Sequence, residues 1–232
     1  MLEPARILYE DNHLIAVNKH VSELVQGDKT GDRTLADEIR DYIKTRDSKP
    51  GNVFLGICHR LDRPTSGLVV FAKTGKALSR MNKLFREDQV SKTYWAVTGV
   101  LPPEQTGVLT GYLKKNESQN KSYVVSKEDK NAKFAELSYR LINKSDRYFL
   151  IEVKPKTGRH HQIRTQLSAA GCPVKGDLKY GFARSDPGGG IHLHARRIEF
   201  SHPVKNELLV ITAPVPDEKL WQILEKDLPC EL

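Results

Sequence analysis

Residues 59–67 read His59-Arg60-Leu61-Asp62-Arg63-Pro64-Thr65-Ser66-Gly67, a charged segment that ends in turn-forming residues. It lies between two apolar runs, 53–57 and 68–72, whose residue types are typical of buried strands. Asp62 stands between two arginines, while Pro64 and Gly67 provide turn geometry after it. A charged segment between buried strands is costly unless it meets a partner or a substrate. A hairpin turn with a local Asp–Arg pair would produce the same pattern.

The chain length bounds the fold and the class of protein. With 232 residues, the chain fits one domain or two small ones and can bury a substantial core. It contains no apolar run of about 18 residues and no signal-peptide pattern at its start, so we expect no membrane span. Cys58, Cys172 and Cys230 form no CxxC pair and leave an odd thiol. We therefore expect reduced thiols and a cytoplasmic protein.

The positive charge is concentrated in one part of the sequence. The chain carries a net charge of +8, but residues 51–205 alone hold 27 basic and 13 acidic side chains, a net +14. Residues 1–50 carry a net −2 and residues 206–232 a net −4. A segregated excess of this size favours a polyanionic partner, because a merely soluble basic protein does not require it.

Periodicity predicts an α+β protein with a mixed, mostly antiparallel sheet. We expect two short strands over 7–19, a helix capped by Thr34, a helix over 76–86 whose outward cations form a solvated face, and a strand over 92–97. Successive antiparallel strands should follow over 107–153, with a polar hairpin tip at 114–121. A tail helix over 217–228 should turn Leu220, Ile223, Leu224 and Leu228 inward. No repeat or linker interrupts the sequence, so we expect a single domain over 1–232.

A third segment, 157–171, combines a helix pattern with charged and histidine side chains. Ile163, Leu167 and Ala170 form its apolar stripe, and Gly171 is a suitable C-cap. Arg164 lies beside this stripe, so its guanidinium should be partly buried and should require a carboxylate.

Five of the eight histidines lie between residues 160 and 202, which raises the question of a metal site. On a helix, His160 and His161 would point about 100° apart. His192 and His194 share a strand face, and the sequence shows no acidic or thiol partner spaced as in known sites. We therefore expect no metal site, and we expect these histidines to be packed, hydrogen-bonded or in contact with phosphate.

Three stretches together resemble the RluA-type pseudouridine synthases. The stretch His-Arg-Leu-Asp-x-x-Thr-Ser-Gly at 59–67 is similar to the family's active-site motif. Lys-x-Tyr-x-Ala at 92–96 and Gly-Arg-x-His-Gln-Ile-Arg at 158–164 resemble its second and third motifs. The resemblance extends from about residue 6 to residue 215, and Gly176-Asp177-x-x-Tyr180-Gly181 also matches. One departure is that Lys19 precedes His20 rather than proline, and we expect this departure not to touch the 59–67 stretch.

The resemblance implies an enzyme that isomerises uridine in RNA, with Asp62 as the catalytic carboxylate. It leaves open whether Asp62 attacks the sugar or takes part in eliminating a ribose proton. It implies that Tyr94 stacks on a flipped base and helps to remove its C5 proton, and that Arg164 pairs with Asp62. The expected RNA-binding residues are His59, Arg60, Lys92, Arg159, His161 and Lys175. Arg60 would either intrude into the RNA stack or clamp a phosphate.

The family's fold adds expectations about architecture and partners. It implies flanking helices around a basic central cleft with Asp62 at its floor, and no separate S4-like RNA-binding domain before the catalytic one. We expect ribosomal or transfer RNA as substrate, no metal, no nucleotide cofactor and a monomer. Two other classes stay open: a non-catalytic RNA-binding module and a metal-dependent nucleic-acid hydrolase, which a chelator would inhibit.

Overall fold

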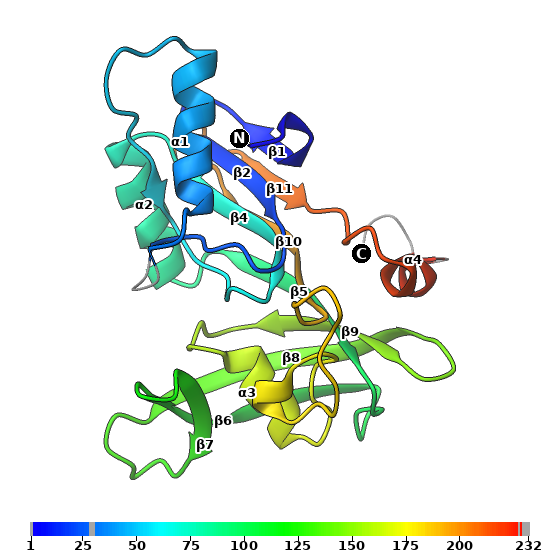
Figure 1. Ribbon diagram of the computed structural model, residues 1–232. Coiled ribbons are helices and arrows are strands. Elements are labelled where there is room, and N and C mark those ends of the chain that lie inside the picture. The colour runs from blue at the N-terminus through cyan, green and yellow to red at the C-terminus, as the bar shows by residue number, and fades with distance from the viewer. Residues whose placement is uncertain (1, 28–30, 227, 229–232) are drawn as a thin grey trace. The chain divides into compact units, whose positions relative to one another are not determined.

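The computed structural model describes residues 2–27, 31–226 and 228, and the chain in it forms two compact units (Figure 1). Unit 1 comprises residues 1–91 and 195–214, and unit 2 comprises residues 92–194 and 215–232. Both units combine antiparallel strands with helices, which confirms the predicted α+β class. The expectation of a single catalytic domain over 1–232 stays a prediction.

The sheet of unit 1 contains both strands predicted over residues 7–19. Its strands follow the order β1 (Ile7–Glu10), β2 (Leu14–Lys19), β4 (Ser66–Ala72), β10 (Leu193–Ser201) and β11 (Leu208–Thr212). The first two residues of β10, 193 and 194, are counted with unit 2. The pairs β1–β2, β2–β4 and β10–β11 are antiparallel, and the short β3 (Gly56–Ile57) pairs with β4. A single 3₁₀ turn, η1 (Pro4–Arg6), precedes β1.

Both predicted helices of unit 1 form, and they lie beside the sheet in Figure 1. The first, α1 (Leu35–Arg46), begins with a capping box in which Thr34 accepts from the Asp37 amide and Asp37 accepts from the Thr34 amide. The second, α2 (Gly75–Arg86), is capped by Thr74. Its Ala77 and Met81 pack in one cluster with alternate residues of β2 and β4, namely Leu14, Ala16, Leu68, Val70 and Ala72.

Unit 2 contains the predicted run of antiparallel strands. Their spatial order is β5 (Ser91–Thr98), β9 (Phe149–Pro155), β8 (Lys133–Lys144), β6 (Thr106–Asn116) and β7 (Lys121–Val125). Every neighbouring pair in this order is antiparallel. The β6–β7 hairpin turns at residues 117–120, within the predicted polar tip. Three short helices complete the unit: α3 (Gln162–Ala169), η2 (Leu178–Tyr180) and α4 (Lys219–Glu225).

Two hydrophobic clusters hold unit 2 together. In the first, Ile163 and Leu167 of α3 pack with Ala96, Ile151 and Val153 of the sheet. In the second, Trp221 and Leu224 of α4 pack with alternate sheet residues, Trp95, Val97 and Leu150. Burying a large apolar side chain contributes about 1.5–3 kcal/mol, so these contacts are the main stabilisation of both helices.

Two predictions about element boundaries were wrong. Only Gly56 and Ile57 of the predicted 53–57 strand pair with a neighbour, and Phe54 is 51% exposed. The tail helix is shorter than predicted, and its inward face includes Trp221, whereas Ile223 is 49% exposed. The packing of Trp221 into the second cluster sets the rotation of this helix, which apolar spacing alone did not reveal.

The structure also bears on the predictions about the cysteines and about membrane spans. Cys58 and Cys172 are free thiols, and Cys230 lies outside the described residues. Among the helices of residues 2–27, 31–226 and 228, none is both long enough and apolar enough to cross a membrane.

Candidate active site

The first motif forms the loop between β3 and β4 in unit 1. The amide of Thr65 donates to the carbonyl of Asp62 at 3.0 Å, which closes a tight turn around the half-buried aspartate. Gly67, near the start of β4, has a φ of +111°, and a Cβ there would lie 2.5 Å from the backbone of Ala195. Because β4 (Ser66–Ala72) begins within the motif, only glycine at position 67 allows the strand to pass this close to the Ala195 backbone.

A fully buried lysine holds this loop in place. The Lys19 ammonium donates to three backbone carbonyls: His20 at 2.9 Å, Arg63 at 3.1 Å and Thr65 at 2.7 Å. The Ser22 amide also donates to the Arg63 carbonyl, at 2.9 Å. The expectation that the Lys19–His20 segment does not touch the motif was wrong. A lysine that ends an apolar strand must satisfy three donors when it is buried, and the carbonyls of the motif loop satisfy two of them.

Burial lowers the pKa of Lys19 to about 8, while the negative charges of Glu23 and Asp62 act in the opposite direction. The ammonium is thus a component of the motif loop, bonded to backbone carbonyls that closely follow Asp62 in the chain.

His59 and Arg60, predicted to contact RNA, occupy different environments. The Nε2 atom of His59 accepts from the Val70 amide at 3.1 Å, and its ring lies 5.2 Å from that of Phe85 on α2. These contacts give His59 a role in shaping the loop. Arg60 is exposed, with its Nη1 atom 3.5 Å from the side-chain oxygen of Gln26.

The second motif lies on β5 in unit 2. Tyr94 pairs with Val153 across the strands and packs, half-buried, on the cluster that contains α3. Lys92 is half-buried, and its ammonium lies 3.9 Å from the position that a Cβ on Gly158 would take. The side chain of Lys92 therefore reaches the start of the third motif.

Arg164, on α3, is 4% exposed and has the carboxylate partner that its burial requires. Its Nε and Nη2 atoms donate to the two carboxylate oxygens of Asp177, at 2.6 and 2.9 Å. Its guanidinium carbon also lies 4.9 Å from the centre of the Tyr180 ring. The predicted carboxylate was Asp62. The structure shows that Asp177 binds the Nε–Nη2 edge, in the two-point geometry that arginine favours.

The backbone around η2 explains how Asp177 reaches Arg164. Gly176 and Gly181 flank η2 with φ values of +85° and +94°. These left-handed residues turn the chain sharply on both sides, so that Asp177 and Tyr180 both face α3. The Gly176-Asp177-x-x-Tyr180-Gly181 match was the available signal, but no pairing could be deduced from it.

The histidine pair at 160–161 does not follow helical geometry. The helix begins only at Gln162, because His161 has a φ of +52°. The two rings are stacked, with centroids 3.8 Å apart and planes at 23°, so the predicted divergence of about 100° was wrong. Burial and the nearby Arg164 charge lower the pKa of His161 to about 2. His161 is therefore a neutral ring whose Nδ1 atom lies 2.9 Å from the Tyr180 hydroxyl.

Of the remaining predicted RNA contacts, Arg159 is exposed and Lys175 is engaged within the protein. Arg159 donates to the Phe134 carbonyl at 2.8 Å. The Lys175 ammonium donates to Asp186 at 2.6 Å and lies 3.3–3.4 Å from both ring nitrogens of His192.

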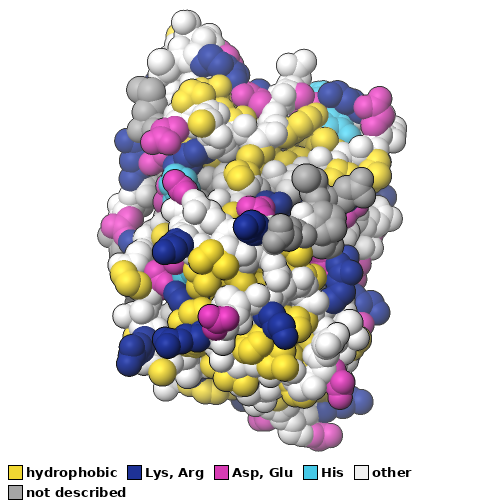
Figure 2. Space-filling view, turned by 90° about the vertical axis from the view of Figure 1, so that its right-hand side faces the viewer, with side chains coloured by type: hydrophobic (Ala, Val, Ile, Leu, Met, Phe, Trp, Pro, Cys, Tyr) yellow, Lys and Arg dark blue, Asp and Glu magenta, His cyan; other side chains and the backbone are white. Residues whose placement is uncertain are grey.

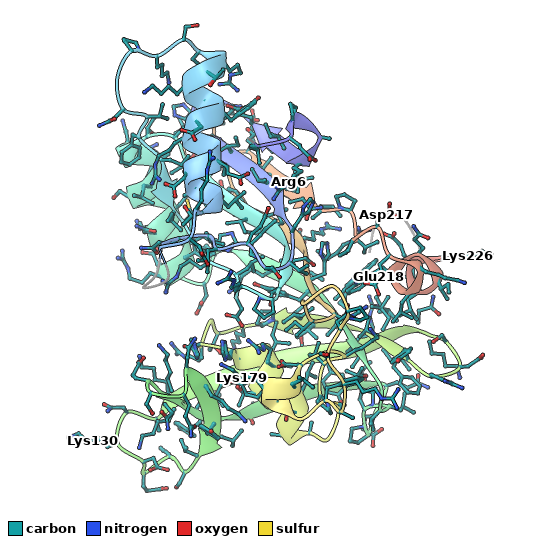
Figure 3. All side chains as sticks on the ribbon, viewed as in Figure 1. Arg6, Lys130, Lys179, Asp217, Glu218 and Lys226 are labelled. Carbon is teal, nitrogen blue, oxygen red and sulfur yellow. The ribbon has the colours of Figure 1, made fainter. Side chains whose placement is uncertain are left out.

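His192 has acidic neighbours that sequence spacing failed to identify. Its Nδ1 atom lies 3.3 Å from Asp186, and its Nε2 atom lies 3.1 Å from Glu218, labelled at the start of α4 in Figure 3. The ligand atoms of these three residues fall within 4.8 Å of one another, an arrangement that can hold a metal ion. The Lys175 ammonium already binds the same Asp186 oxygen, so a metal ion would have to compete with it.

Comparison with known proteins places the chain in a family. The RNA pseudouridylate synthase family matches residues 13–169. A ribosomal large subunit pseudouridine synthase C of Vibrio parahaemolyticus is 34% identical over 94% of this chain and 68% of its own length. A tRNA pseudouridine synthase C of the same organism is also 34% identical, over 94% of this chain and 92% of its own length.

Two solved structures share the fold over most of the chain. Human RNA pseudouridylate synthase domain containing 4 superimposes with a TM-score of 0.78 at 26% identity, covering 94% of this chain and 92% of its own. Human RNA pseudouridylate synthase domain containing 1 gives a TM-score of 0.73 at 27% identity, covering 90% and 83%. The family match, the relatives and these structures agree with the resemblance of the three motifs. The chain therefore belongs to the RNA pseudouridylate synthase family, in its RluA-type branch, whose members are isomerases.

Proposed function

We propose that this protein converts specific uridines in ribosomal or transfer RNA to pseudouridine, with Asp62 as the catalytic carboxylate. The observation that carries the proposal is that Asp62, Tyr94 and Arg164 all fall, in motif order, inside the family-matched segment 13–169. Relatives named for large-subunit ribosomal RNA and for tRNA match this chain equally well, so both RNA classes are candidate substrates.

Asp62 would act at C1′ of the target nucleotide. The reaction detaches uracil from C1′, turns the base and rejoins it through C5, without net oxidation. A carboxylate can stabilise or attack the sugar carbon as the glycosidic bond breaks, as carboxylates do in glycoside cleavage. The turn that carries Asp62 is fastened by Lys19 and Ser22, which supports a role that depends on fixed geometry.

Tyr94 and Arg164 would act on the flipped base and on the carboxylate. Tyr94 would stack on the uracil and help to remove its C5 proton. The Asp177 carboxylate holds the Nε–Nη2 edge of Arg164, so a pairing of Arg164 with Asp62 would have to use the Nη1 side. With its two sides used in this way, the guanidinium would be oriented by the Asp177 carboxylate and would form an ion pair with the Asp62 carboxylate.

The predicted RNA contacts divide into two groups in this proposal. Arg60, Lys92 and Arg159 would contact phosphates or bases directly. His59, His161 and Lys175 are engaged within the protein and would act by shaping the surfaces around them. The enzyme would work in the cytoplasm as a monomer, without a metal or nucleotide cofactor.

The test is an Asp62→Asn variant, which keeps the shape of the side chain and removes its charge. We expect pseudouridine formation to become undetectable while RNA binding is retained, when pseudouridines are mapped in total ribosomal and transfer RNA after incubation with each protein. Asp41→Asn, at an exposed carboxylate of α1, is the matched control and should retain activity. More than about a tenth of normal turnover in Asp62→Asn would contradict the catalytic assignment.

The same assay separates the other two classes of function. Wild-type activity that persists in a chelator argues against a metal-dependent hydrolase. A wild-type protein that binds RNA and forms no pseudouridine on any tested RNA would be a binding module instead.

A further inference from the structure

The charged side chains on the exposed side of α2 are all basic. Lys76, Arg80, Lys83 and Arg86 are all exposed, and at 100° per residue they fall within about 120° of the helix circumference. We call these four residues the α2 basic row. The opposite side of the helix, with Ala77 and Met81, is buried in the core of unit 1. The sequence pattern alone favoured a solvated face for Arg80, Lys83 and Arg86.

The neighbouring helix α1 shows what a solvated face looks like in this unit. Its exposed face mixes acidic and basic residues, which form ion pairs that include Arg40–Asp37 at 2.7 Å and Arg46–Glu10 at 2.6 Å. On the face of the molecule in Figure 2, basic and acidic side chains are likewise interspersed. By contrast, the sequence of α2 contains no acidic residue between Lys76 and Arg86.

Helix stability does not explain this pattern. A helix favours acidic residues in its first turn and basic residues in its last, because of its macrodipole. The first turn of α1 contains Asp37 and Glu38, as expected. The first turn of α2 contains no acidic residue and instead carries Lys76. The dipole accounts for Lys83 and Arg86, but the placement of Lys76 opposes it.

The contacts of these cations leave their charge largely uncompensated within the described part of the chain. Arg80 donates to the carbonyl of Pro203 at 2.7 Å, which is a neutral partner. Lys83 lies 4.0 Å from Glu87, at the limit of an ion pair, and both side chains are solvent-exposed. Lys76 and Arg86 have no ion-pair partner among residues 2–27, 31–226 and 228.

The buried side of α2 packs against the chain that leads into the first motif. The Phe85 ring lies 5.2 Å from that of His59, three residues before Asp62. Leu78 lies so close to Gly56 that a Cβ there would be 2.7 Å from its side chain. The α2 basic row is therefore carried by a helix fixed to the segment that positions Asp62.

We propose that the α2 basic row binds phosphates of the substrate RNA on the part of the strand that flanks the target uridine. This inference rests on the proposed function, since it assigns a binding surface for the same substrate. From Lys76 to Arg86 the helix spans about 15 Å, enough to follow several phosphates of a nucleic-acid backbone. A membrane surface is a poor fit, because membrane-binding helices insert an apolar side and that side of α2 is buried.

The experiment is a salt titration of RNA binding by the full-length protein. The test variant carries Lys76→Gln, Lys83→Gln and Arg86→Gln, and keeps Arg80 because of its contact with Pro203. The control variant carries Arg33→Gln, Lys44→Gln and Lys49→Gln, which remove the same charge from exposed positions on and around α1. Binding to a fluorescent RNA hairpin with a uridine loop is measured across a KCl series, with thermal unfolding of every variant as a check of folding.

Each phosphate contact contributes about 0.7–0.9 to the log–log salt slope. Loss of three contacts should therefore reduce the slope of the test variant by about 2–2.7, which corresponds to roughly 50- to 170-fold weaker binding at about 0.15 M salt. The control variant should keep most of the wild-type slope. A third variant that conserves charge, with Lys76→Arg, Lys83→Arg and Arg86→Lys, should also keep it.

The outcomes separate this inference from the proposed function. Equal losses in the test and control variants would mean that only net charge matters and would overturn the inference, as would an unchanged slope in the test variant. In either case, pseudouridine formation by the wild-type protein would leave the proposed function standing. Absence of pseudouridine formation by the wild type, together with absence of RNA binding, would refute the proposed function itself.

Discussion

Replacement of Lys19 by methionine tests whether the buried ammonium positions the motif loop. The substitution preserves an unbranched side chain of similar length and removes the donors to His20, Arg63 and Thr65. A buried carbonyl that loses its donor costs about 1–3 kcal/mol. The bond to Thr65 is buried, whereas the other two are partly buried, so the smaller end of this range applies to them. Relief of the cost of burying the ammonium offsets part of the loss, and we expect a net destabilisation of about 2 kcal/mol.

The effect on catalysis should exceed the effect on stability. Two of the carbonyls that lose their donor, those of Arg63 and Thr65, follow Asp62 within three residues, so the motif loop should relax. The Asp62 carboxylate should then lose its fixed position, and we expect turnover to fall at least about tenfold. The matched control is Lys73→Met, just beyond the opposite end of β4. Lys73 donates to Glu10 at 2.6 Å and to the Asp11 carbonyl at 2.7 Å. The control variant should lose stability and keep its activity at temperatures where it is folded.

The pH dependence of stability gives a second readout. Burial lowers the pKa of Lys19 to about 8 from its ordinary 10.5. Between these values the unfolded chain binds more protons than the folded one, so the contribution of this group to stability increases as the pH rises. At about 1.36 kcal/mol per pH unit, the whole interval corresponds to roughly 3 kcal/mol. The stability advantage of the wild type over Lys19→Met should therefore grow from about pH 7 to about pH 10.

Chemical unfolding at both pH values and turnover on RNA provide the measurements. Normal turnover in a folded Lys19→Met protein would refute the positioning role. A stability difference from the wild type that stays constant over this pH range would refute the assignment of the titration to Lys19.

Two further predictions concern the buried arginine and the charge of the whole surface. Arg164→Met and Asp177→Asn should each lower the free energy of unfolding by about 3–5 kcal/mol, and the double variant should lose less than the sum of the two. Stability losses that simply add, within about 0.5 kcal/mol, would show that the two residues are not energetic partners. The same cycle with Asp62 in place of Asp177 tests the proposed second pairing. Wild-type RNA binding with about five phosphate contacts should give a log–log salt slope of about −3.5 to −4.5, and a slope near zero would mean that the basic segment 51–205 does not face RNA.

Some features of this protein depend only on neighbours in the sequence, and these could be predicted. The cap of α1 follows from Thr34 standing just before apolar residues at helical spacing, and the body of α2 follows from its own apolar spacing over 76–86. The strands of unit 2 follow from alternation, as in Leu137 and Tyr139. The family motifs also lie in short continuous stretches, so their order and spacing are evident from the sequence alone.

The partners of the charged side chains depended on the tertiary structure. Lys19 meets carbonyls 44 and 46 residues away in the chain, and His192 meets a carboxylate 26 residues away, because strand pairing and the docking of α4 bring these segments together. Arg164 meets Asp177 because two left-handed glycines turn the chain around η2. The helix pattern indicated that Arg164 needs a carboxylate partner, and the order of the family motifs suggested Asp62 as that partner.

The difference between the features that could be predicted and the charge partners that could not has one physical origin. Helix caps, periodic apolar faces and turn residues act over a few residues, so their free energies are set by local composition. The partner of a buried charge is selected by which distant backbone and side-chain groups the packed fold brings within about 3 Å, and a single residue in an unusual conformation can change that choice. His161 is such a residue: its left-handed backbone delays the start of the helix to Gln162 and stacks two histidines that helical geometry would have separated.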